Sequence, residues 1–555
     1  MKKRWWHDAV VYEIYCKSFC DSNGDGIGDI PGVISKLPVL KELGINTIWF
    51  TPLYKSPQVD NGYDVEDYQS IDPDYGTMED FKRLLDTAHD MGIRVIMDLV
   101  LNHSSDKCKW FQEAKKSRDN PYRNYYIWHD GKPDGSEPNN WANYFYEGKG
   151  SAWEWDEATQ QYYLHLYSKH MPDLNWDYQP LREEVYAMMR WWLDMGVDGF
   201  RLDVFPSLKK PEGFPDAEGP LDVNGFAQDR KNRCNVPGLH EILHEMNTEV
   251  FSKYDCMTVG EAIRTPYTIA ADYIRAERKE LDSLYHFEVC HRLPKVTTVP
   301  EYKAAQVRWA KIVENDAWLA QHLSNHDFPR QVSRFGNDQE YRKECAKLLA
   351  TLTHTLPGTP YVYQGEEIGM TNVAFETIEE YNDAYTVGQY HSMIRAGKSE
   401  EETWALLRPI SRDNARTPYQ WDGSRHSGFT SGKPWLGLNP RYPEINLEAD
   451  RKDPDSIFAY YQQLIAMRKD NPAIVDGLFE MLIPEHDKIV MYLRKCTRQT
   501  LLVVANFSGD ALELPLPEQV TGHRWQQLLC NCTDSDCLAA KSLKPWEAAI
   551  YEMTE

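Results

Sequence analysis

The 555-residue sequence lacks any apolar run long enough to cross a bilayer. Its first residues are basic and aromatic, and no apolar stretch of signal-peptide length precedes Asp8. The sequence therefore predicts a protein with no membrane partner.

Positive charge is also scarce. The chain carries 85 acidic and 61 basic side chains, which gives a formal net charge of -24. A surface of this sign repels nucleic acids and anionic membranes, although it carries no information about the fold. We therefore expect no polynucleotide partner.

Cysteine is sparse, and its number is odd. Eleven cysteines are spread over the chain, a pattern typical of free thiols in a reducing compartment rather than of a disulfide framework. We therefore expect a cytoplasmic protein. Its length allows two or three domains, and we expect a monomer or a weak homo-oligomer.

The chain does contain a repeated helix-strand unit. Three times a helix-like run closes on a glycine and a short apolar strand follows: Gly44 before residues 45–50, Gly92 before 93–98 and Gly196 before 197–203. Glycine is the usual left-handed stop of a helix, and a continuous apolar strand suits a parallel sheet covered on both faces. The pattern places Asp98 and Asp203 at the carboxyl ends of parallel strands, where barrels build their active sites.

Five further segments have an apolar core and a polar exit: residues 9–15, 257–261, 284–289, 318–326 and 359–366. Together with the first three they make eight strands. Eight parallel strands alternating with helices close a (β/α)8 barrel, the TIM barrel, through right-handed crossovers.

The spacing of the glycine stops indicates an insertion. Gly44 and Gly92 are 48 residues apart, whereas Gly92 and Gly196 are 104 apart, and the excess follows the third strand. After residue 477 the sequence reads as short strands separated by turns, which predicts an antiparallel β-sandwich. The expected domains are the first part of the barrel, an inserted subdomain, the second part of the barrel and a C-terminal β domain, at residues 1–103, 104–172, 173–476 and 477–555.

Three acids follow three of the predicted strands: Asp203, Glu261 and Asp327. In a single barrel the carboxyl ends of these strands lie at the same mouth, so the three side chains are expected to lie close together. Clustered, shielded carboxyl groups shift each other's pKa values apart, which is how acid and nucleophile roles are divided in glycoside hydrolysis. The sequence therefore predicts a carboxylate-based active site.

The flanking residues carry a resemblance to a known family. Residues 98–103, 199–204, 259–261 and 324–327 resemble, in order, the four signature segments of the α-amylase superfamily, glycoside hydrolase family 13. Further stretches look like its oligo-1,6-glucosidase group, at residues 60–64, 172–175, 358–367 and 411–418. The match spans nearly the whole chain.

The resemblance implies a retaining, double-displacement mechanism. In it, Asp203 attacks the anomeric carbon, and Glu261 protonates the leaving oxygen and then deprotonates water. Asp327 binds sugar hydroxyls and stabilises the distorted transition state. Arg201, two residues before Asp203 in a strand, faces the same side and holds that carboxylate ionised.

The resemblance also implies the substrate-binding residues. His103 and His326 donate hydrogen bonds to sugar hydroxyls, and Tyr63 stacks on the sugar face. Asp60 and Arg412 clamp the terminal glucose and turn the site into a pocket closed at the non-reducing end. Arg416 competes with Arg412 for this role.

Val204, directly after the predicted nucleophile, resembles the residue that accompanies α-1,6 preference in this group. A branched apolar wall beside the leaving group would crowd one glucosyl orientation and admit another. The expected enzyme is a retaining, exo-acting α-glucosidase. It removes terminal α-1,6-linked glucose, and α-1,4-linked glucose as a second linkage, from short oligosaccharides such as isomaltose.

Residues 21–29 read much like a calcium loop. Asp21, Asn23, Asp25 and Asp29 supply side-chain oxygens, and Ile27 supplies a carbonyl oxygen. The glutamate expected at the twelfth position is replaced by glycine. We expect a structural Ca²⁺ or Mg²⁺ there, and a plain turn is the alternative.

Three alternative functions remain open. The Ser56–Asp60 stretch resembles trehalose-6-phosphate hydrolases equally well, and Arg264 or Lys209 and Lys210 would then bind phosphate. A sucrose-acting transglucosidase or isomerase is a second alternative. The third is a catalytically silent, amylase-like interaction domain, which is disfavoured because all three acids are present.

Overall fold

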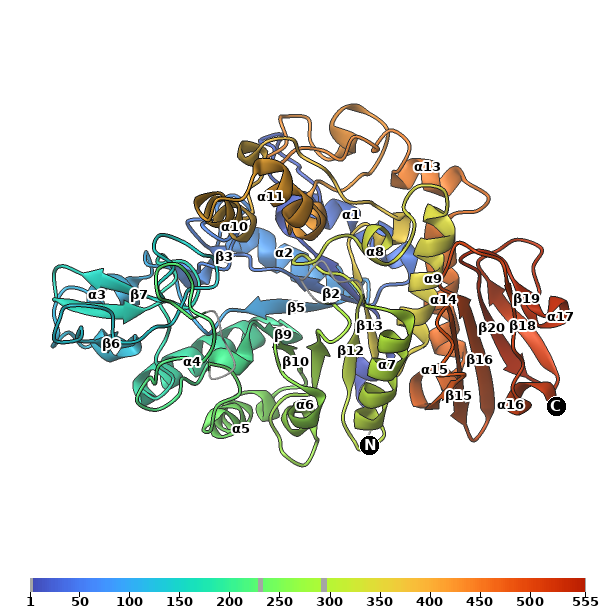
Figure 1. Cartoon of the computed structure of the whole chain (residues 1–555), viewed down its shortest axis with the longest axis horizontal. Coiled ribbons are helices and arrows are strands. Elements are labelled where there is room, and N and C mark those ends of the chain that lie inside the picture. Colours follow the sequence, from blue (N-terminus) through green and yellow to red (C-terminus); the bar gives the residue numbers. More distant parts are fainter. Residues whose placement is uncertain (1–2, 228–232, 291–296, 555) are drawn as a thin grey trace.

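The computed structural model describes residues 3–227, 233–290 and 297–554. Eight parallel strands close a barrel in the order β1-β13-β12-β11-β10-β9-β5-β2, as the sequence predicted (Figure 1). Their bounds are β1 Val11–Ile14, β2 Thr47–Phe50, β5 Arg94–Leu99, β9 Gly199–Leu202, β10 Met257–Ala262, β11 Ser283–His286, β12 Leu319–Gln321 and β13 Thr359–Tyr363.

Helices surround the barrel strands. The main ones are α1 Ile30–Leu43, α2 Met78–Asp90, α4 Gln179–Met195, α5 Leu239–Glu249, α6 Tyr267–Ile274, α7 Val299–Val313, α9 Arg342–Thr355 and α14 Ile457–Asp470. Helices α1 and α4 end on Gly44 and Gly196, whose φ angles of 101° and 112° confirm the predicted left-handed stops. In the described residues, no helix is both long enough and apolar enough to span a bilayer.

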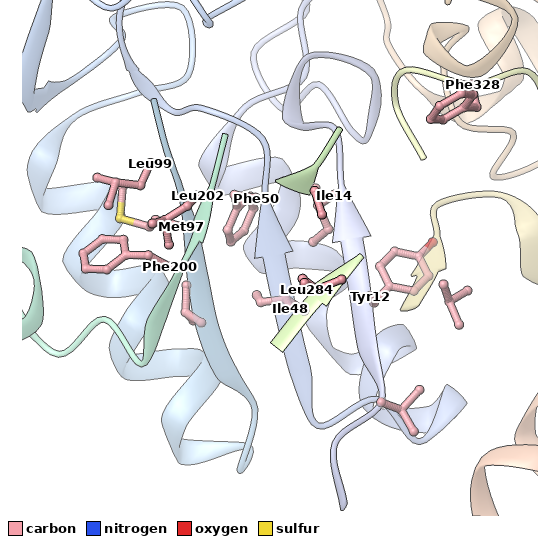
Figure 2. Close-up of a cluster of buried hydrophobic side chains, with 14 of the residues drawn as sticks. Tyr12, Ile14, Ile48, Phe50, Met97, Leu99, Phe200, Leu202, Leu284 and Phe328 are labelled. Carbon is pink, nitrogen blue, oxygen red and sulfur yellow. The ribbon is translucent and has the colours of Figure 1, made fainter. Parts of the chain in front are cut away.

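The side chains of the barrel strands alternate between two cores. Figure 2 shows Tyr12, Ile14, Ile48 and Phe50 among the side chains of one core, which also contains residues of the surrounding helices. The intervening residues, such as Trp49, belong to a second core inside the barrel. This period of two sends Glu13, Asp98, Arg201 and Glu261 inward at the carboxyl ends of their strands.

A small subdomain follows β5. Its three-stranded sheet has the order β6-β8-β7, with β6 Trp128–His129, β7 Trp153–Asp156 and β8 Gln161–Leu164, and helix α3 Lys109–Ala114 precedes it. A hairpin of β3 Tyr54–Lys55 and β4 Asp67–Ile71 follows β2. Both segments leave the barrel after strand ends, on the side of the inward-facing acids.

Short helices occupy the remaining loops. They are α8 Gln331–Phe335, α10 Ala384–Arg395, α11 Glu400–Leu407, α12 Asp413–Arg416, α13 Leu447–Lys452 and α15 Pro472–Asp476. The long excursion after β13 that contains α10, α11 and α12 was not predicted as a separate feature. It brings Asp383, Arg412 and Arg416 to the barrel.

The chain ends in an antiparallel five-stranded sheet of order β14-β15-β16-β20-β18, lying beside α9, α14 and α15 (Figure 1). The strands are β14 Leu478–Leu482, β15 Ile489–Cys496, β16 Gln499–Asn506, β18 Trp525–Cys530 and β20 Ala548–Met553. A second, two-stranded sheet pairs β17 Leu512–Glu513 with β19 Ser542–Leu543. Two short helices, α16 Glu518–Thr521 and α17 Cys537–Ala540, complete this domain.

Candidate active site

One guanidinium group gathers the acids at the mouth of the barrel. Arg201 Nη1 lies 2.6 Å from Asp203 Oδ1 and 3.0 Å from Asp98 Oδ1, and its Nη2 lies 2.9 Å from Glu261 Oε2. Asp203 and Glu261 therefore contact the two terminal nitrogens of the same group and face the same space. This is the convergence that the sequence predicted for these two acids.

Burial sets the protonation of this cluster. Removal from water raises the pKa of Asp203 well above its usual range and that of Asp98 to about 6, and Arg201 opposes both shifts. Three carboxyl groups share one guanidinium. Like charges this close favour keeping a proton within the cluster, which general acid catalysis requires, and the direct contact of Arg201 with Asp203 favours negative charge on Asp203.

The backbone after Asp203 holds Glu261. The Val204 N–H donates to Glu261 Oε2 at 3.0 Å. To do so, Val204 adopts left-handed angles, φ 32° and ψ 39°, which a β-branched residue rarely occupies. Strain at this position therefore accompanies the link between the two acids.

Asp327 joins the site from a loop rather than from a strand. The strand predicted over residues 318–326 ends at Gln321 because pairing with β11 and β13 stops there, so this part of the prediction was wrong. Asp327 Oδ1 accepts from Arg416 Nη2 at 2.8 Å and from Arg412 Nη1 at 3.2 Å. Two arginines from the segment after β13 thus orient this carboxylate.

Arg412 is the arginine that reaches Asp60. Its Nη2 lies 2.8 Å from Asp60 Oδ1, and its Nε lies 2.6 Å from Asp383 Oδ1. Burial raises the pKa of Asp60, and Arg412 opposes the shift. Arg416 instead donates to the His326 carbonyl and to Asp327, so the structure gives the Asp60 contact to Arg412.

The predicted sugar-binding rings are already hydrogen-bonded within the protein. His326 Nε2 lies 2.8 Å from Tyr63 Oη, and the two rings stack with centroids 5.3 Å apart. His103 Nε2 lies 3.1 Å from the Tyr63 carbonyl, and its Nδ1 lies 3.1 Å from the Asn102 side-chain amide. Burial lowers the pKa of His103 to about 4, so this ring is neutral near pH 7.

These side chains line a single pocket. Its wall combines Asp60, Tyr63, His103, Asp203, Val204, Glu261, Asp327 and Arg412 with Tyr144, Phe145, Tyr167, Met171 and Ile263. Arg201 and His326 lie behind this wall and contact its acids or Tyr63. All nine predicted catalytic and substrate-binding residues are therefore in the pocket or directly behind it.

Some residues of the site were not singled out from the sequence. The aromatic side chains of the inserted subdomain, Tyr144, Phe145 and Tyr167, carry no spacing signal. Asp383 was hidden in the excursion after β13. Glu13, in contrast, is the one charged residue in the apolar run from Val10 to Ile14, and that isolation was a readable signal.

Comparison with known proteins identifies the family. Residues 13–477 match the family model described as "Alpha amylase, catalytic domain", and residues 479–547 match "Maltogenic Amylase, C-terminal domain". An oligo-1,6-glucosidase from Halalkalibacterium halodurans is 47% identical over 561 residues, which cover 99% of each chain. The chain belongs to the α-amylase family, glycoside hydrolase family 13.

Solved structures of this family overlay on the whole chain. Trehalose-6-phosphate hydrolase from Bacillus licheniformis is 43% identical with a TM-score of 0.91, and isomaltulose synthase from Protaminobacter rubrum is 39% identical with a TM-score of 0.93. Both comparisons cover 100% of each chain. The protein is therefore a glycoside hydrolase with the α-amylase fold.

The basic side chains proposed for phosphate binding differ in exposure to solvent. Lys210 is buried and pairs with Asp173 at 2.8 Å, and Lys209 pairs with Asp177. Neither lines the pocket. Arg264 is exposed and lies next to Ile263 of the pocket wall.

The predicted metal loop is built from tight turns. Asp21 Oδ1 accepts from the N–H groups of Asn23 and Gly24, and its Oδ2 accepts from that of Gly26. Asp29 caps α1 by accepting from Gly32 N at 2.6 Å. Within residues 3–227, 233–290 and 297–554, no group of three or more histidine, cysteine or acidic side chains is placed to hold a metal ion. The metal assignment of Asp21, Asn23, Asp25, Ile27 and Asp29 stays a prediction.

Proposed function

We propose that this protein is a retaining, exo-acting α-glucosidase that releases terminal glucose from short α-1,6-linked oligosaccharides such as isomaltose. The observation that carries the proposal is the pairing of Arg412 with Asp60 in a pocket that Asp203 and Glu261 also line. A buried ion pair of this kind supports a pocket that accepts one terminal sugar. The oligo-1,6-glucosidase relative supports the linkage.

In the proposed mechanism, the Asp203 carboxylate attacks the anomeric carbon while Glu261 donates a proton to the leaving oxygen. The products of this step are the free aglycone and a glucosyl ester on Asp203. Glu261, now a carboxylate, then takes a proton from water, and the hydroxide oxygen displaces Asp203 with net retention. Asp327, oriented by Arg412 and Arg416, binds the sugar hydroxyls, and Arg201 stabilises Asp203 as a leaving carboxylate.

Trehalose-6-phosphate hydrolysis is the second candidate. It is favoured by the similarity to the hydrolase from Bacillus licheniformis and by the exposed Arg264 beside the pocket. It is disfavoured because Lys209 and Lys210 are paired with aspartates. Sucrose isomerisation has the support of the isomaltulose synthase similarity alone.

A product assay distinguishes these activities. Purified protein is incubated with isomaltose, panose, maltose, sucrose, trehalose and trehalose 6-phosphate, and Asp203→Asn serves as the inactive control. We expect the highest kcat/KM on isomaltose and a loss of roughly 10³-fold or more in Asp203→Asn. A higher kcat/KM on trehalose 6-phosphate would transfer the assignment to the second candidate.

A structural Ca²⁺ or Mg²⁺ in the loop of residues 21–29 is part of the proposal. It is supported by the donor set, since carboxylate, amide and carbonyl oxygens suit hard cations. Thermal unfolding with and without a chelator tests it. If a metal binds this loop, the chelator should lower the Tm of the wild type but not that of Asp25→Ala. An unchanged wild-type Tm would support the plain turn.

A cytoplasmic location and a monomeric or weakly associated state also belong to this proposal. All eleven cysteines lie in the described part of the chain as free thiols, and eight are buried. Such a set is suited to a reducing compartment. Cell fractionation and light scattering of the purified protein are the corresponding measurements.

A further inference from the structure

A hydrogen-bonded chain extends from Glu13 on β1 to the catalytic acids. The Glu13 side chain is buried at the end of the barrel interior, with 2% of the residue exposed. Its Oε1 lies 2.6 Å from His326 Nδ1 and 3.2 Å from the His326 backbone nitrogen. Glu13 therefore contacts one edge of the histidine ring and the backbone of the same residue.

The opposite edge of the ring continues the chain. His326 Nε2 lies 2.8 Å from Tyr63 Oη, which lies 2.9 Å from Asp98 Oδ2. Asp98 in turn accepts from Arg201, which contacts Asp203 and Glu261. Glu13 is thus connected to the reacting carboxylates through three intermediate side chains and one guanidinium.

The donor and acceptor of each hydrogen bond in this chain follow from Asp98, the carboxylate at its far end. The Tyr63 hydroxyl donates to Asp98 Oδ2, and well above pH 6 the ionised Asp98 carboxylate can only accept. Tyr63 Oη must then accept from His326, which requires a proton on Nε2. A neutral imidazole with its proton on Nε2 has a bare Nδ1, which accepts and cannot donate.

We propose that Glu13 is a positioning residue of the glucose-binding pocket, and that it acts as a neutral carboxylic acid whose O–H donates to His326 Nδ1. This bond fixes His326 in the Nε2–H tautomer. That tautomer makes the Tyr63 hydroxyl donate to Asp98, and Asp98 then remains a full acceptor for Arg201. The catalytic relevance of this chain rests on the proposed glucosidase activity.

The surroundings of the pair favour the neutral form over an ion pair, because His326 is the ion-pair partner of Glu13 in the described part of the chain, whereas Asp203 contacts Arg201 directly. Burial raises the pKa of Glu13 well above its usual range and lowers that of His326 well below its own. The charged groups that act on Glu13 are Arg201, which opposes the rise, and Asp98 and Asp327, which add to it. Around His326, Arg201, Arg412 and Arg416 disfavour an imidazolium, and Asp327 favours it.

The protonation state can be read directly from the histidine nitrogens. Protein labelled with ¹⁵N-histidine is measured by NMR at pH 7.5, without substrate, and the His326 signals are assigned by their loss in His326→Gln. We expect one unprotonated signal for Nδ1 and one protonated signal for Nε2. Two protonated nitrogens, or a proton on Nδ1 alone, would overturn the proposal whatever the enzyme's substrate is.

Two variants at the same position test the role of the donor. Glu13→Gln keeps an N–H donor toward His326 Nδ1 and cannot ionise, although its amide nitrogen does not accept from the His326 backbone N–H. Glu13→Ala removes both interactions. We expect kcat/KM on isomaltose to fall about tenfold or more for Glu13→Ala, and to fall at least about threefold less for Glu13→Gln. We also expect the His326 tautomer to persist in Gln and to become mixed in Ala. Equal losses in the two variants, with both folded by thermal unfolding, would contradict the proposal.

Discussion

At the level of single residues, several carboxyl groups of the site share the same arginine. Arg201 contacts Asp98, Asp203 and Glu261, and Arg412 contacts Asp60, Asp327 and Asp383. Two buried guanidinium groups thus organise six carboxyl groups. Arginine suits this task because its planar fork holds several carboxylates at fixed angles and remains charged when buried.

We expect Val204 to influence which glucosidic linkage the enzyme prefers. Its side chain lines the pocket directly after Asp203 in the chain, and its backbone has strained, left-handed angles. Val204→Ala should lower the ratio of kcat/KM on isomaltose to that on maltose about tenfold, because a branched wall that selects one orientation is lost. The two disaccharides are measured on one preparation, so each serves as the control for the other.

The same variant also has an expected stability. Left-handed angles cost a β-branched residue more than they cost alanine, and this relief offsets packing lost with the buried side chain, so Val204→Ala should unfold close to the Tm of the wild type. An unchanged linkage ratio at an unchanged Tm would show that Val204 does not select the linkage.

The prediction for Arg412 concerns the clamp on terminal glucose. Arg412→Lys keeps one positive charge but loses the fork that reaches Asp60, Asp327 and Asp383 together. We expect kcat/KM on isomaltose to fall roughly 100-fold, equivalent to about 2.7 kcal/mol of transition-state binding. Steady-state kinetics with a parallel thermal melt measure the loss.

Arg408→Lys is the matched control, since Arg408 donates to the Phe375 and Glu376 carbonyls and lies outside the pocket. Its kcat/KM should stay within about twofold of the wild type. If Arg412→Lys is as active as this control, then Arg412 does not bind the terminal glucose in the way we propose.

At the scale of elements, the barrel was readable because each strand has local signals. Glycine stops and apolar runs with polar ends predicted all eight strands within a few residues, except that β12 ends at Gln321 instead of continuing to His326. The loop beyond it is fixed by tertiary contacts, such as the His326 N–H to Glu13 bond, and such contacts have no local signature.

The site residues, like the strands, could be predicted only where the sequence carries a local signal. Acids that directly follow strands, such as Asp203, could be placed because parallel strands share one exit. The partners of Arg412 could not, because Asp383 lies in an excursion without strand signals. The tautomer chain through Tyr63 and His326 depends on ring orientations that no spacing in the sequence encodes.

Strand β9 packs closely against β10 at Gly199, and we expect this contact to require glycine. A Cβ at Gly199, where φ is 159°, would lie 2.1 Å from the Met257 carbonyl oxygen. Gly199→Ala must therefore separate the strands that carry Asp203 and Glu261. We expect a loss of about 3 kcal/mol of stability, measured by denaturant unfolding.

Gly213→Ala is the control for this prediction. Gly213 also has a positive φ, of 74°, but nothing lies within 4 Å of its Cβ position. Its cost should be only the backbone strain of about 1 kcal/mol. Equal losses at the two positions would show that the close strand approach is not what requires glycine at Gly199.

At the scale of the whole molecule, the barrel and the C-terminal sheet share one core. Side chains of β15, β16 and β20, including Tyr492, Val503 and Ile550, belong to the same buried cluster as the barrel strands and helices. The Tyr492 hydroxyl lies 2.5 Å from Thr355 Oγ1 at the end of α9. The C-terminal domain is therefore expected to unfold together with the barrel.

The molecule also contains many buried acids whose pKa values are raised, and this determines how its stability depends on pH. Glu366, in the turn after β13, is the clearest case: burial raises its pKa to about 8, although it accepts from Ser324 Oγ at 2.5 Å. Its unfolded pKa is near 4.5. Between these values the folded state holds a proton that the unfolded state has released, so stability falls as pH rises.

Glu366→Gln should remove this contribution, because an amide does not titrate. Its free energy of unfolding should fall less steeply from pH 5 to 8 than that of the wild type, by at most about 1.4 kcal/mol per pH unit. Urea unfolding at several pH values measures the two slopes. Exposed Glu401→Gln is the control and should leave the slope unchanged. If Glu366→Gln also leaves the slope unchanged, then Glu366 is ionised in the folded enzyme, and Arg330, whose charge opposes the rise of its pKa, outweighs more of the burial than we expect.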